Sequence, residues 1–235
     1  MSARKSLRPR PAWVVGLVLI CLVAAGAVAM SRGTFAILGG AAGAASTAEE
    51  TEQPPTAVFV GDSYTAAEGG EGVRWTSLVA QEQGWRELNV GRGGTGWTVA
   101  VPADRCRYGT CPTYPEVAHE VVDLAPEIVV VAGGRNDRGN DVAAAAAETF
   151  ATLREGLPDA RIYAVSPFWD STAYPAHLIA QGRDVREEVR RVGGEYLEVG
   201  HPLGGRPDLI TQDGIHPNAA GYRALAEAVN EALDR

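Results

Sequence analysis

The sequence predicts an α/β protein with a parallel sheet that helices cover on both faces. From residue 56 onward, short apolar runs alternate with longer amphipathic segments. Regular alternation of strands and helices is typical of parallel sheets built from right-handed crossovers. The run at 127–134 is β-branched through its centre, as expected for a strand buried on both faces. Residues 56–235 are therefore predicted to form the folded domain.

The first half of this domain contains three predicted strands and two predicted helices. The apolar run at 56–61 predicts a buried strand, and the amphipathic segment 73–84 predicts a helix that ends in glycine. A short strand is expected at 86–91, leading into a glycine-rich loop. Helical periodicity at 115–126 stops at a proline, and the β-branched run at 127–134 follows.

The second half repeats the alternation. Residues 141–158 predict a helix that ends at a Gly-Leu-Pro sequence, and 160–168 predict a fourth strand. Residues 176–193 are mostly helical in pattern, although a glycine interrupts them. A short fifth strand is expected at 195–200. The last helix is expected at 217–235, with a proline in its first turn.

Residues 1–32 are expected to lie in or pass through a membrane. Four basic residues precede a charge-free apolar run from residue 11 to 31, and about 20 apolar residues span a bilayer. An uncleaved anchor is favoured by the length of the run. The alternative is a signal peptide cleaved after the small residues Ala27 and Ala29. Both alternatives place the remainder outside the cytoplasm, either anchored to the membrane or secreted.

The residues that follow the apolar segment differ from it in composition and charge: a linker comes first, and an acidic domain comes after it. Residues 33–55 are rich in Gly, Ala, Ser and Thr and end in acids and prolines, which is typical of a flexible linker. The first 35 residues hold five basic residues and no acid, which leaves 16 basic and 29 acidic residues and a net charge of −13. Such a domain is not expected to bind nucleic acid or an anionic membrane surface.

Cys106 and Cys111 are the only cysteines of the predicted domain. In an oxidising compartment, they predict a short disulfide. The alternative is a two-ligand metal site, which is disfavoured because no histidine or further cysteine lies nearby at ligand spacing. No metal is therefore expected.

Ser63 follows the first predicted strand, at the sheet edge where ligand sites of open α/β sheets form. A serine becomes a nucleophile only when a base takes its proton. His216 is the best candidate, because the other three histidines lie in predicted helices or in a connecting loop. Asp213, three residues earlier, can orient the imidazole. Taken alone, each residue fits an ordinary polar loop better than a catalytic site, and only their joint occurrence favours catalysis.

Acyl transfer also needs hydrogen-bond donors for the developing oxyanion. The backbone N–H of Ser63, the N–H of Gly94 and the side-chain amide of Asn136 are the candidates, each in a loop that follows a predicted strand. A flexible glycine loop and a turn are the structural alternatives. The Lys-Ser/Thr pair of a phosphate-binding loop does not follow the glycines.

Four blocks carry these residues: "GDSY" at 61–64, a glycine block with Gly94, "GRND" at 134–137 and "DGIHP" at 213–217. In composition and order they resemble the blocks of the SGNH (GDSL-type) hydrolases. The resemblance implies a flavodoxin-like three-layer α/β/α fold with a five-stranded parallel sheet. It also implies a Ser63–His216–Asp213 triad and hydrolysis of esters or thioesters without a metal or an organic cofactor.

The expected function is that of an extracytoplasmic serine esterase acting on short-acyl or O-acetyl esters of glycans or small molecules. Tyr64 and Trp97 are expected to form a wall for the substrate, although simple packing explains them equally well. Lysophospholipid, other lipid or thioester substrates are alternatives. A non-catalytic glycan-binding module on the same fold is a further one. The oligomeric state is not predicted.

Overall fold

Five strands form one parallel sheet in the computed structural model, which describes residues 53–235. The strand order is β2-β1-β3-β4-β5, and every neighbouring pair is parallel. The strands are β1 (Thr56–Gly61), β2 (Arg86–Asn89), β3 (Ile128–Ala132), β4 (Arg161–Val165) and β5 (Glu195–Leu197). The predicted α/β class with five parallel strands is therefore confirmed.

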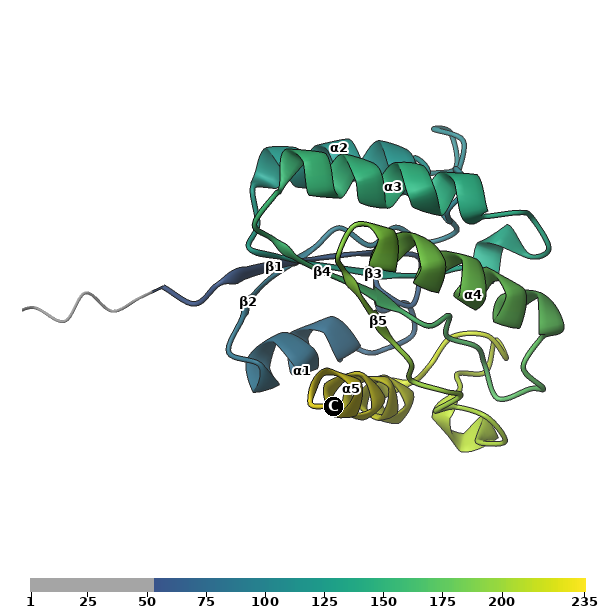
Figure 1. Cartoon of the computed structure of the whole chain (residues 1–235). Helices are drawn as coiled ribbons and strands as arrows, with labels where there is room; N and C mark the ends of the chain where they lie inside the picture. The colour runs from purple at the N-terminus through teal and green to yellow at the C-terminus, as the bar shows by residue number, and fades with distance from the viewer. Residues whose placement is uncertain (1–52) are drawn as a thin grey trace, which may run out of the picture. The chain divides into compact units, whose positions relative to one another are not determined.

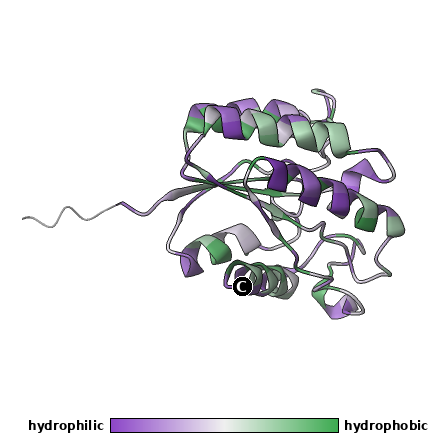
Figure 2. Cartoon of the chain, in the orientation of Figure 1, coloured by the Kyte–Doolittle hydropathy of each residue, from purple (hydrophilic) through white to green (hydrophobic). Residues whose placement is uncertain are grey.

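Helices cover both faces of the sheet (Figure 1). One layer holds α1 (Trp75–Glu82) and α5 (Ala219–Leu233). The other holds α2 (Tyr114–Leu124), α3 (Ala143–Gly156) and α4 (Ala176–Arg191). Two 3₁₀ turns, η1 (Arg135–Asp137) and η2 (Pro207–Leu209), lie in loops beyond β3 and β5. The central strands are coloured mainly as hydrophobic, whereas α4 is mainly hydrophilic (Figure 2).

Each face of the sheet has its own hydrophobic core. Side chains alternate along β1, so that Val58 and Val60 pack against α2 and α3 while Ala57 and Phe59 pack against α1 and α5. All four side chains are at most 2% exposed. Full burial of a valine or phenylalanine side chain contributes roughly 1.5–3 kcal/mol. These two cores hold the strand ends in place, and with them the loops that follow.

Several elements are shorter than predicted. β2 ends at Asn89, β3 at Ala132 and β4 at Val165, so the polar residues beyond these strands form loops. The proline expected in the first turn of the last helix, Pro217, lies before it. Asn218 is instead the N-cap residue. Its Oδ1 accepts hydrogen bonds from the backbone N–H groups of Ala220 and Gly221, at 3.0 Å each.

The predicted membrane segment 1–32, and the linker 33–55 apart from its last three residues, lie outside the described residues. Within residues 53–235, no helix is long and apolar enough to cross a membrane.

Candidate active site

Ser63 lies in a tight turn directly after β1. The turn is closed by hydrogen bonds from the N–H of Ala66 to the carbonyl of Asp62, at 2.9 Å, and from the N–H of Glu68 to the carbonyl of Ser63, at 3.0 Å. Gly61 is required at the end of the strand, since a Cβ atom there would overlap the Thr65 side chain and the backbone of β3. Ser63 is therefore held at the carboxyl end of a central strand.

The imidazole of His216 is oriented by Asp213. The distance from His216 Nδ1 to Asp213 Oδ2 is 2.6 Å, and Asp213 Oδ1 accepts hydrogen bonds from the His216 N–H at 2.9 Å and the Ile215 N–H at 2.8 Å. Desolvation would raise the pKa of Asp213, but these bonds and one from the Thr211 hydroxyl hold that pKa well below its usual range. Asp213 thus remains ionised and favours the tautomer with the proton on Nδ1.

The predicted residues meet around one cavity of about 430 Å³. Within residues 53–235, no hydrogen bond joins Ser63 Oγ to His216, and the two residues meet only as neighbours in the lining of this cavity. The cavity is lined by Ser63, Gly94, Asn136 and His216, together with Glu68, Arg135, Arg138, Trp169 and Ile215. Loops after β1, β2 and β3 and the segment before α5 thus contribute, as the sequence predicts.

The two proposed oxyanion donors outside Ser63 belong to loops that are tied together. Gly94 has a φ of +82°, a conformation that favours glycine. The Asn136 amide donates to the carbonyl of Thr95 at 2.8 Å. The buried Asp137 carboxylate accepts from the N–H of Trp97 at 3.0 Å and from the N–H of Thr98 at 2.7 Å. Asp137 therefore anchors the end of the loop that contains Gly94.

The sequence matches that of a known protein family. Residues 59–224 match the model of the GDSL-like Lipase/Acylhydrolase family. The chain belongs to this family. It is 30% identical to a GDSL lipase of Mycobacterium tuberculosis over 74% of this chain and 79% of that protein. GDSL-type hydrolases cleave esters, so the protein is an ester-hydrolysing enzyme.

Solved structures share the fold of this GDSL-type hydrolase. A family two carbohydrate esterase from Clostridium thermocellum, in complex with cellohexaose, superposes with a TM-score of 0.58 at 18% identity, covering 78% of this chain and 65% of that chain. An acetylxylan esterase variant from Geobacillus stearothermophilus gives a TM-score of 0.54 at 18% identity, covering 77% and 94%. At these identities the likeness supports the fold alone.

The prediction that Tyr64 and Trp97 form a substrate wall is wrong for this hydrolase. Tyr64 is 2% exposed, and its hydroxyl donates to the carbonyl of Ile215 at 2.6 Å. Trp97 is 1% exposed and packs against Tyr114 and Phe150. Neither side chain lines the cavity. Burial of a large ring in the adjacent core is the more favourable arrangement for both residues.

The aromatic and cationic side chains that do line the cavity include Trp169 and Arg135. The guanidinium of Arg135 lies 3.9 Å from the centroid of the Trp169 ring and donates to Asp170 Oδ2 at 2.8 Å. Sequence reasoning missed all three residues. Only Arg135 could have been predicted to lie near the site, because it directly precedes Asn136 in the "GRND" block.

The predicted disulfide is present between Cys106 and Cys111, with a Cα–Cα distance of 5.7 Å. Gly109, with a φ of +86°, lies at the turn of the loop that it closes. The two cysteines are therefore not available as metal ligands.

The buried carboxyl group of Asp62, next to Ser63, is expected to lower the stability of the fold at neutral pH. Burial raises its pKa to about 6, although the Tyr64 N–H and Arg135 oppose this. A folded-state pKa above the unfolded value of 3.8 means that stability is lost as the pH rises through 4 to 6. Asp62→Asn is expected to raise the free energy of unfolding at pH 7 by roughly 3 kcal/mol.

Urea denaturation of both proteins at several pH values measures this difference. The advantage of Asp62→Asn should disappear near pH 3.5, where both side chains are neutral. An equal difference at pH 3.5 and pH 7 would contradict a buried, ionising Asp62. Glu71→Gln, an exposed change in the same segment, serves as the control and should leave the pH dependence unchanged.

Proposed function

We propose that the protein is an extracytoplasmic serine esterase with Ser63 as nucleophile, His216 as general base and Asp213 as the residue that orients it. The observation that carries the proposal is the convergence of Ser63, Gly94, Asn136 and His216 on one cavity. The 2.6 Å contact between Asp213 and His216 supports it. These residues come from four separate segments of the chain, so their meeting is not a consequence of sequence proximity.

The mechanism follows from these positions. His216 Nε2 takes the Ser63 hydroxyl proton while Oγ attacks the ester carbonyl. The N–H groups of Ser63 and Gly94 and the amide of Asn136 stabilise the tetrahedral oxyanion. The imidazolium then protonates the departing alcohol, and water, activated by the same imidazole, hydrolyses the acyl-enzyme. No step requires a metal or an organic cofactor.

We propose short-acyl esters on glycans as the preferred substrates. Proteins with this fold include a carbohydrate esterase and an acetylxylan esterase, which is the reason to test glycan esters first. The cavity supports this choice, because its walls carry Arg135, Arg138 and Glu68 beside one indole, Trp169. A long acyl chain would find little continuous apolar surface there. The curated relative named as a lipase is the reason to retain lipid esters as a second candidate.

Two assays separate these substrates. We expect kcat/KM for p-nitrophenyl esters to be highest at acetate or propionate and to fall with longer chains. We also expect acetate release from O-acetylated xylan, measured against chemically deacetylated xylan as the control. A rate maximum at eight or more acyl carbons, with no acetate released from xylan, would instead support the lipid alternative.

We propose that the domain acts outside the cytoplasm, held there by residues 1–32 or released by their cleavage. The charge-free apolar run and the Cys106–Cys111 disulfide support this location. N-terminal sequencing of the mature protein distinguishes a retained segment from a cleaved one. Recovery of all protein in the cytoplasmic fraction would contradict the proposal.

A further inference from the structure

Glu68 places a second carboxylate beside the imidazole of His216. Its Oε2 lies 3.6 Å from His216 Nε2, and the two side chains are 20% and 19% exposed. Its backbone is fixed on both sides, because its N–H donates to the carbonyl of Ser63 at 3.0 Å and its carbonyl accepts from the Tyr222 hydroxyl at 2.8 Å. His216 therefore lies between two carboxylates, with Asp213 at Nδ1 and Glu68 at Nε2.

Gly93 provides the space for this carboxylate. A Cβ atom at position 93 would overlap Glu68 Oε1. The glycine block therefore serves two purposes: Gly94 faces the cavity as the proposed oxyanion donor, and Gly93 admits the side chain of Glu68.

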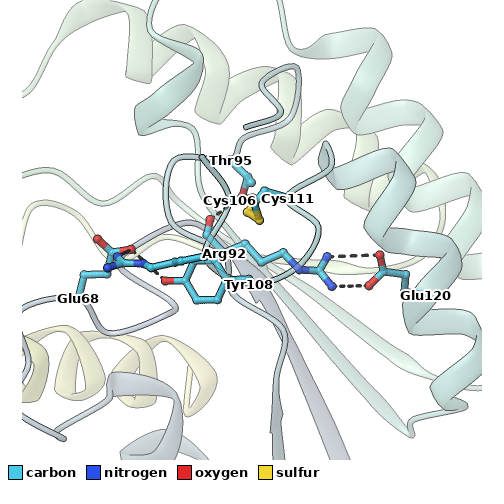
Figure 3. The surroundings of a disulfide bond; sticks show 8 residues. Glu68, Arg92, Thr95, Cys106, Tyr108, Cys111 and Glu120 are labelled. Carbon is cyan, nitrogen blue, oxygen red and sulfur yellow. Dashed lines mark hydrogen bonds and ion pairs between the residues drawn. A yellow bond between two sulfur atoms is a disulfide. The ribbon is translucent and has the colours of Figure 1, made fainter. Parts of the chain in front are cut away.

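The disulfide loop holds the other oxygen of Glu68 (Figure 3). Arg107 forms an ion pair with Oε1, and the Tyr108 hydroxyl donates to the same atom at 3.0 Å. Both residues lie between the two cysteines of the disulfide. The loop thus binds Oε1 of Glu68, while Oε2 faces His216 Nε2, the atom that is proposed to take the Ser63 proton.

We propose that Glu68 is a positioning residue of the ester hydrolysis, which stabilises the imidazolium form of His216, and that the disulfide loop limits this effect. The proposal rests on the function of His216 proposed above. A Glu68 carboxylate whose only partner is His216 Nε2 would favour the protonated imidazole, which cannot act as a base. Arg107 and Tyr108 bind Oε1 of Glu68. They therefore offset part of the negative charge of the carboxylate and keep it from moving closer to His216 Nε2.

The charged groups that face His216 define the signs of the expected effects. Asp213, Glu68 and the buried Asp62 favour the imidazolium, while Arg135 and Arg138 across the cavity oppose it. Loss of the Glu68 charge should therefore move the acid limb of the kcat/KM profile to lower pH. Loss of Arg107 should move it to higher pH.

The test is the pH dependence of p-nitrophenyl acetate hydrolysis by the full chain between pH 5 and 9. With Glu68→Gln we expect the acid limb to shift down by about 1 pH unit, the lower end of the range for a close opposite charge. With Arg107→Gln we expect a smaller upward shift. Reduction of the disulfide should shift the limb in the same direction as Arg107→Gln, because it frees the loop. Glu120→Gln, whose carboxylate pairs with Arg92 instead, is the matched control and should not shift it.

A direct readout separates positioning from stability. NMR titration of the His216 ring, assigned by comparison with His216→Asn, should show the same two opposite shifts in a Ser63→Ala background. Unchanged midpoints in both Glu68→Gln and Arg107→Gln would overturn the proposal while leaving the function of His216 intact. Failure of the proposed function would be distinguishable, because Ser63→Ala would then retain activity.

Discussion

Replacement of Ser63 by alanine is expected to lower kcat for p-nitrophenyl acetate by roughly 10⁴-fold or more. Among the described residues that line the cavity, Ser63 is the only one with a hydroxyl group. Without it, His216 has no oxygen to activate except that of water. The oxyanion donors would remain, so a small residual rate above that of buffer is also expected.

Ser166→Ala is the matched control for this experiment. Ser166 is also buried and follows β4 of the same sheet, and its Oγ accepts a hydrogen bond from the Val199 N–H at 3.0 Å. Loss of that bond should cost about 1 kcal/mol of stability without a comparable loss of turnover. Equal activity losses in the two variants would indicate a folding defect rather than the removal of a nucleophile.

Replacement of Asn136 by alanine is expected to lower kcat by roughly 10²–10³-fold while KM changes little. The amide is proposed to donate to an oxyanion that exists only in the tetrahedral state, so its loss raises the barrier without weakening substrate binding. Steady-state kinetics with p-nitrophenyl acetate measures both constants.

Asn140→Ala provides the control for Asn136, because Asn140 also donates to the glycine loop, to Thr98 Oγ1 at 2.9 Å, but does not line the cavity. Its kcat should stay within about twofold of the unchanged protein. Urea denaturation would show whether loss of the Asn136–Thr95 bond also affects folding. A rise in KM at constant kcat for Asn136→Ala would assign the amide to substrate binding instead.

The strand and helix pattern was predictable because each element carries a local signal. The apolar run before Ser63 and the β-branched run at 127–134 have few alternatives to buried strands. The residues gathered at the cavity were also predictable, because parallel strands place the loops that follow them at one edge. Asp213 and His216 lie three residues apart, so their contact needed only a turn.

What sequence reasoning missed depends on contacts between distant segments. Tyr64 and Trp97 lie in loops that follow strands, yet both rings are buried in the core. Their burial depends on aromatic partners far along the chain, such as Phe168 for Tyr64 and Phe150 for Trp97. Asp137 anchors residues about 40 positions earlier, and Glu68 meets a loop about 40 positions later. Polar residues of this kind look like ordinary loop residues until the fold brings their partners together.

Covalent labelling measures directly whether Ser63 is an activated nucleophile. The full chain is treated with a fluorophosphonate, and the adduct is located by peptide mass spectrometry. We predict one adduct, on the peptide that contains Ser63. It should be absent in Ser63→Ala and formed much more slowly in His216→Asn. An unlabelled Ser63 in folded protein that still binds glycan, or an adduct on another serine, would show that Ser63 is not the nucleophile.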